Sequence, residues 1–127
     1  MALISFDKDA VIEYTPEFGG NRESENPCVV RLKFVSNAKA QHYTSLVRAK
    51  AKRNLNDLAL VTEALQDVQK KQFIEHVESV SGYTLTSGKE VTTAEEFYET
   101  ADRLLVEEVL KAMESSAKLS EAQRKNS

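Results

Sequence analysis

An apolar stripe through the middle of the chain constrains the fold more than any other feature of the sequence. Most of its members lie three or four positions apart, and they are Leu58, Val61, Leu65, Val68, Phe73, Val77 and Val80. This spacing places apolar side chains on one face of a helix, which then needs another element to cover it. We therefore expect one helix over residues 58–80. Gly82 would end it, because glycine suits the left-handed backbone at a helix terminus.

A second apolar stripe, over residues 97–113, offers that cover. Thr92 with Glu95, and Thr93 with Glu96, have the spacing of a capping box, which marks a helix N-terminus. The two carboxylates also complement the positive end of the helix dipole. We expect a long last helix that begins at one of these threonines and continues to the end of the stripe.

An earlier helix is expected from residue 38 to about residue 53. Ser36 or Asn37 precedes it, and both residue types accept hydrogen bonds from the free N–H groups of a first helical turn. Asn56 or Asp57 provides a similar cap for the central helix. The sequence thus predicts about three helices, two of them long.

The N-terminal part of the chain predicts a small β-hairpin. Residues 3–6 and 10–14 are β-prone and flank the polar residues 7–9, which suit a turn. Residues 28–35 alternate apolar and basic side chains, as in a strand with one buried face. We expect strands 10–14 and 28–35 to pair and to pack on the helices. The predicted fold class is mainly α with a small N-terminal β-hairpin (α+β).

The length of 127 residues fits one small domain. We place it at residues 1–119, with a β-hairpin region at 1–35 and a helical region at 36–119. Residues 120–127 are polar and are expected to form a flexible C-terminal tail. The net charge of −3 argues against nucleic-acid binding, which needs a concentrated excess of Lys and Arg. No segment has the roughly 20 apolar residues that span a bilayer, so no membrane partner is expected.

The residue types that carry chemistry are scattered. His42 and His76 lie on separate helices without further ligands nearby in the sequence, and a metal site needs three or four that converge. Cys28 begins a strand, whereas a reactive thiolate is usually stabilised at a helix N-terminus. We therefore predict no metal, no cofactor and no catalytic residue, and we expect that the protein is not an enzyme.

Acidic residues near the C-terminus have a structural interpretation. Glu107 and Glu108 are adjacent, as paired acid–base groups can be. However, Glu99 with Arg103, and Glu107 with Lys111, have the spacing of ion pairs on an exposed helix face. We expect such pairs and no catalytic dyad.

Two further features suggest phosphate binding but fit it poorly. The basic run consists of Arg48, Lys50, Lys52 and Arg53, of which Arg48 and Lys52 share a helix face, and no aromatic residue interleaves to stack a base. The Gly19-Gly20 pair lacks the spacing of a phosphate-binding loop. We interpret the pair as a turn and the run as a solvated face.

Two segments resemble a known family. Residues 12–22, Ile-Glu-Tyr-Thr-Pro-Glu-Phe-Gly-Gly-Asn-Arg, followed by the strand at 29–34, resemble the opening of small tail-morphogenesis proteins of siphophages. The endings at 105–113 and 119–127 are similar to the C-termini of such proteins. Together they resemble a tail assembly chaperone of bacteriophages. The resemblance implies a protein of the host cytoplasm that keeps the tape-measure protein soluble and recruits tail-tube subunits during tail morphogenesis.

Partner binding would then use apolar helix faces. Our hypothesis is that Phe73, Val77, Leu105, Val109 and Met113 contribute to this surface. Whether the chain forms a homo-oligomer stays open. The alternative function is a small structural virion protein, a tail, neck or head-associated subunit, whose strand at 29–34 would extend the sheet of a neighbour.

Overall fold

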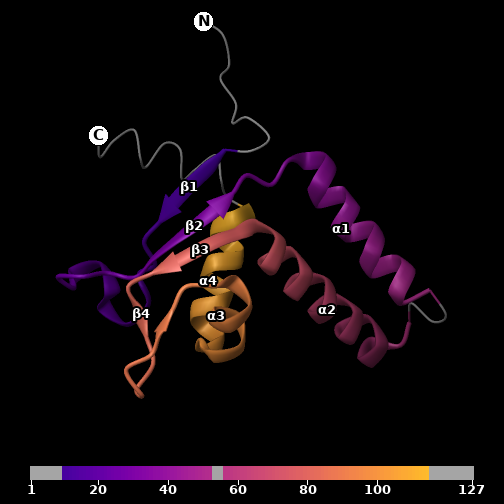
Figure 1. The fold of residues 1–127 in the computed structure, drawn as a ribbon. Coiled ribbons are helices and arrows are strands. Elements are labelled where there is room, and N and C mark those ends of the chain that lie inside the picture. The colour runs from indigo at the N-terminus through magenta and orange to yellow at the C-terminus, as the bar shows by residue number, and fades with distance from the viewer. Residues whose placement is uncertain (1–9, 53–55, 115–127) are drawn as a thin grey trace, which may run out of the picture.

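The computed structural model describes residues 10–52 and 56–114 (Figure 1). Along the chain its elements are β1 (Val11–Tyr14), the 3-10 helix η1 (Phe18–Glu23), β2 (Val29–Lys33), α1 (Asn37–Lys50), α2 (Leu58–His76), β3 (Val77–Ser81), β4 (Tyr83–Thr84), β5 (Glu90–Val91), α3 (Ala94–Thr100) and α4 (Arg103–Glu114). The α+β class is confirmed. The described residues form four α-helices and a 3-10 helix instead of the three helices expected. The predicted strand 3–6, turn 7–9 and tail 120–127 lie outside the described residues.

The main sheet has three antiparallel strands in the order β1-β2-β3. The predicted pairing of strands 10–14 and 28–35 is confirmed, because Ile12 lies opposite Leu32 and Tyr14 opposite Val30. β2 is the central strand and is hydrogen-bonded on both sides. It has no open edge, so the expectation that residues 29–34 extend the sheet of a neighbour is wrong.

The single helix expected over residues 58–80 was wrong at its C-terminal end. α2 stops at His76, and the chain continues directly as β3. The register between β2 and β3 shifts so that Leu32 pairs with Val77 while Val30 pairs with Val80. This bulge brings both valines to the buried face although they are three positions apart. A bulged strand thus produced the spacing of a helix.

The last helix is also divided. α3 begins after Thr93, whose side chain accepts a hydrogen bond from the Glu96 N–H as predicted. It ends at Ala101, whose backbone is extended, and α4 follows. Asp102 starts α4, since its carboxylate accepts a hydrogen bond from the Leu104 N–H at 2.8 Å. The break allows the two short helices to pack on the core in different directions.

The molecule has two parts, which we call the body and the arm. The body comprises the strands, α3, α4 and residues 73–76 of α2; the arm comprises α1 and residues 58–72 of α2. Figure 1 shows α3 and α4 gathered against the sheet, while α1 and α2 extend away from it side by side. Ser36 caps α1 and Asp57 caps α2, both as predicted.

The hydrophobic core lies in the body, between the sheet and its helices. Its largest fully buried side chains include Phe73 and Phe97, whose rings stack with centroids 5.9 Å apart. The five residues that we expected on a partner-binding surface belong to this core: Phe73, Val77, Leu105, Val109 and Met113, each at most 6% exposed. That expectation is therefore corrected. The apolar stripes that carry these residues cover each other and the sheet.

Candidate functional site

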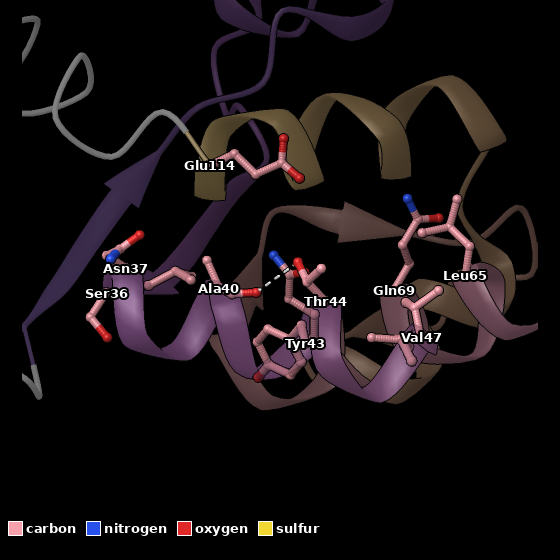
Figure 2. A pocket seen from close by; sticks show the side chains of 12 residues that line it. Ser36, Asn37, Ala40, Tyr43, Thr44, Val47, Leu65, Gln69 and Glu114 are labelled. Carbon is pink, nitrogen blue, oxygen red and sulfur yellow. Dashed lines mark hydrogen bonds between the residues drawn. The ribbon is translucent and has the colours of Figure 1, made fainter. Parts of the chain in front are cut away.

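The arm contains a groove between its two helices. The groove has a volume of about 460 Å³, and its lining consists of Val35, Ser36, Asn37, Ala40, Tyr43, Thr44, Val47, Leu65, Val68, Gln69, Gln72 and Glu114. Figure 2 shows the side chains of α1 and α2 facing each other across it, with Glu114 of α4 above the end next to the sheet. A volume of this size is within the range of sites that bind ligands or peptide side chains.

The walls of the groove follow from helical spacing. On α1, Asn37, Ala40, Thr44 and Val47 recur every three or four residues. On α2, Leu65, Val68 or Gln69, and Gln72 have the same spacing. Each helix therefore lines the groove with one face, and the charged residues of α2, such as Asp67 and Lys70, lie on other faces.

Apolar surface remains exposed along the arm. Leu65, at the end of the groove away from the body, is 44% exposed, whereas Val68, one helical turn closer to the body, is 2% exposed. The apolar row on α2 continues from Leu65 through Val61 to Leu58, which is 79% exposed at the far end of the arm. Monomeric proteins usually cover contiguous apolar surface, so such a row indicates a binding site.

Tyr43 lines the groove, and a second aromatic ring, that of His76, packs against it. Tyr43 of α1 lies edge-on to His76 of α2, with ring centroids 5.8 Å apart. His76 Nδ1 lies 3.3 Å from the Lys33 carbonyl oxygen, while His76 Nε2 and the Tyr43 hydroxyl are buried without a hydrogen-bond partner among the described residues. Burial lowers the pKa of His76 and raises the pKa of Tyr43 to about 12. Both rings are therefore neutral near pH 7.

The other candidate residues have structural roles. Burial raises the pKa of Cys28 to about 11, which disfavours the thiolate that a nucleophile needs. Gly19 and Gly20 both have positive φ inside η1, so they form a tight turn as interpreted from the sequence. The described residues contain no group of three or more His, Cys, Asp or Glu side chains that could hold a metal ion. Arg48 and Lys50 are exposed on α1 and Lys52 is exposed in the turn after it, whereas Arg53 lies outside the described residues.

The acidic residues form ion pairs, but with partners other than those expected. Glu99 pairs with Lys70 at 2.9 Å, and Glu107 pairs with Arg103 at 3.0 Å. The helix break at residues 101–102 explains the change, because it places Glu99 and Arg103 on different helices.

Glu108 has a role that the sequence analysis missed. Its carboxylate accepts hydrogen bonds from the Tyr14 hydroxyl and from the backbone N–H groups of Glu17 and Phe18, the latter two at 2.7 and 3.1 Å. These hydrogen bonds hold the end of β1 and the segment after it against α4. These partners are about ninety positions away in the sequence, so no local pattern indicates the contact.

The groove also differs from the site that the sequence predicted. Leu65 belongs to the apolar stripe that we identified, but Thr44, Gln69 and Gln72 carried no signal of their own. A usable signal was present in α2, where the residues flanking the stripe on its groove side are uncharged. This pattern suits a surface that a partner dehydrates, because no charge has to be buried.

No protein-family model matches the chain, and no curated protein or solved structure matches it. The likeness to tail-morphogenesis proteins therefore rests on the residues quoted in the sequence analysis. Within residues 10–52 and 56–114, no helix is both long and apolar enough to cross a membrane.

Proposed function

We propose that the protein is a phage tail assembly chaperone. It binds the tape-measure protein and tail-tube subunits in the host cytoplasm during tail morphogenesis, and it makes or breaks no covalent bond. The observation that carries the proposal is the groove of the arm, which has an apolar floor, uncharged walls and a half-exposed Leu65 at its outer end. The resemblance of residues 12–22 and 105–113 to tail assembly chaperones gives the proposal its biological setting.

The client segment in this proposal is an apolar face of a helix. Two helices that lie side by side accept the side-chain ridge of a third helix, as in other helix-in-groove complexes. Each contact is small, so one groove binds weakly. A long client that offers many such segments binds several chaperone copies, and tube subunits displace them one at a time.

The binding residues in this proposal are on the arm. Val47, Leu65 and Val68 provide the apolar floor, and Leu58 extends it toward the far end. The core residues first expected there keep the body folded, so a client does not have to unfold the body to bind.

Co-expression with the tape-measure protein of the same phage tests the proposal. We expect the chaperone to raise the soluble fraction of the client several-fold, and Leu65→Glu to abolish the gain. Leu104→Glu is the matched control, because Leu104 is 63% exposed on α4 and does not line the groove. Circular dichroism of both variants checks that they remain folded. No gain in solubility with the unmodified chain would overturn the proposal.

The alternative function is a small structural virion protein. Because β2 is enclosed, a sheet extended by a neighbour would begin at an edge strand such as β1, which has Val11 44% exposed. Mass spectrometry of purified virions separates the two functions. A chaperone is absent from the finished particle, whereas a structural subunit is present in it.

A further inference from the structure

Charged side chains lie at the two ends of the groove and along neither wall. At the end next to the sheet, Glu114 is the one acidic or basic residue among the described residues that line the groove. At the other end, Arg48 lies one helical turn beyond Thr44 on α1, whereas Lys50 lines a separate hollow with Glu63 and Asp67. Arg48 is exposed, and it forms no ion pair with another described residue.

The shape of the groove favours a single helix as its occupant. Its walls are two helices that run side by side, so a third helix can place its ridge between them. A second copy of this chain would present another groove, and two concave surfaces leave an unfilled space between them. An extended strand would leave its backbone N–H and C=O groups unpaired against side-chain walls.

Charge complementarity then specifies the helix. Its inserted face must be uncharged, because the groove offers Val47, Leu65 and neutral amides but no counter-charge along its length. Its two ends meet opposite charges, Arg48 at one and Glu114 at the other. Electrostatic complementarity of this kind fixes the orientation of a partner more than it adds affinity.

We propose that the groove binds an amphipathic client helix with an uncharged apolar face, an acidic end beside Arg48 and a basic end beside Glu114. This inference rests on the proposed function, in which the groove receives a client helix. It adds the chemistry of the segment and the direction in which the segment lies. Candidate segments within a client are those with leucine-type helical spacing between an acidic and a basic turn.

Synthetic peptides of about the length of α1 test the inference by fluorescence anisotropy with the full chain. One peptide has a leucine stripe on an alanine and glutamine background, with glutamates at one end and lysines at the other; the second has glutamines in place of all the charges. At low salt we expect the charged peptide to bind about fivefold more tightly. The difference should disappear at high salt, where exposed charges are screened.

Charge reversal in the protein gives the decisive comparison. Arg48→Glu makes both ends of the groove negative and Glu114→Lys makes both positive, so each should abolish the fivefold preference. The double variant should restore it, because the peptide then binds in the opposite direction. Lys71→Glu is the matched control on the same arm, since Lys71 does not line the groove.

The outcomes separate the inference from the proposed function. Binding of neither peptide would overturn the proposed function of the groove. Equal binding of both peptides, or a double variant that stays weak, would overturn the orientation and leave the function standing. If sedimentation shows a dimer that Leu65→Glu dissociates and neither peptide displaces, the occupant is a second copy and the inference is wrong.

Discussion

The body and the arm differ in how much of their apolar surface they cover. In the body, residues distant in the sequence bury one another, and Phe73 and Phe97 are fully enclosed. In the arm, Tyr43 is the buried residue of α1, and Ala64 and Val68 are those of residues 58–72 of α2. The body therefore supplies most of the stability, and the arm keeps an open apolar face. This division suits a protein that folds first and binds afterwards.

The strongest test of this difference is to truncate one large apolar side chain in the body and one in the arm. Phe73→Ala should lower the free energy of unfolding by about 4 kcal/mol, because it leaves a cavity against Phe97 and Tyr98. Leu65→Ala should cost less than about 1 kcal/mol, since Leu65 is already 44% exposed. Urea unfolding followed by circular dichroism measures both. Equal losses would show that the arm is as firmly packed as the body.

A turn in the body provides the next largest effect. Gly82 has φ +72°, and a Cβ there would lie 2.6 Å from the Pro27 carbonyl oxygen. Gly82→Ala should therefore lower the free energy of unfolding by about 2 to 3 kcal/mol. Gly88→Ala is the matched control, because Gly88 has φ +90° but open space around it, and about 1 kcal/mol is expected. Similar losses in urea titrations would mean that the close approach to Pro27 contributes nothing.

The arm was more predictable from the sequence than the body because its signals are local. Ser36 and Asp57 each accept a hydrogen bond from a residue three positions ahead, so the cap is visible in the sequence itself. The groove could be predicted only in part. The stripe includes Leu65, but which part of it stays uncovered depends on how α1, α3 and β3 pack on α2, and these contacts join residues that are distant in the sequence.

The body is held together by contacts between residues distant in the sequence, and short-range sequence patterns do not predict such contacts. Val77 and Val80 have helical spacing, and only pairing with β2 converts them into a bulged strand. By contrast, the break before α4 was visible in principle, since Asp102 is a good cap residue within a long apolar stripe. The five residues that we placed on the partner-binding surface are buried for the same reason. Because α2 ends at His76, β3 and α4 can pack against its last turn and join it in the core.

A substitution at Glu108 measures how much one long-range polar contact contributes to the stability of the body. Glu108→Gln should lower the free energy of unfolding by about 1.5 kcal/mol, because the amide keeps one acceptor oxygen and its NH2 group cannot accept a hydrogen bond from the donor that faces it. Its neighbour is the control: Glu107→Gln removes one exposed ion pair with Arg103 and should cost less than about 0.5 kcal/mol. If thermal and urea unfolding place the two variants at the same stability, the contact has no energetic role.

The smallest effect concerns the joint of the two parts, where His76 of the body meets Tyr43 of the arm. Burial lowers the pKa of His76, with smaller opposing contributions from the Lys33 carbonyl and Glu75 and a further lowering by the ammonium groups of Lys39 and Lys33. The unfolded chain, with its ordinary histidine pKa near 6.5, takes up the proton first as the pH falls. The histidine contribution to stability is therefore full above that value and is lost below it, down to the lowered pKa of the folded chain.

The urea midpoint of the unmodified chain should accordingly fall between about pH 7 and pH 5, and His76→Gln should reduce this fall. Glutamine keeps an N–H donor for the Lys33 carbonyl but has no proton to gain in this range, so the variant removes titration more than packing. His42→Gln, on the exposed side of α1, should leave the pH dependence unchanged. An identical fall in all three proteins would assign it to other groups. A fall that disappears with His76 would mean that acid loosens the arm at its attachment to the body, where the groove begins.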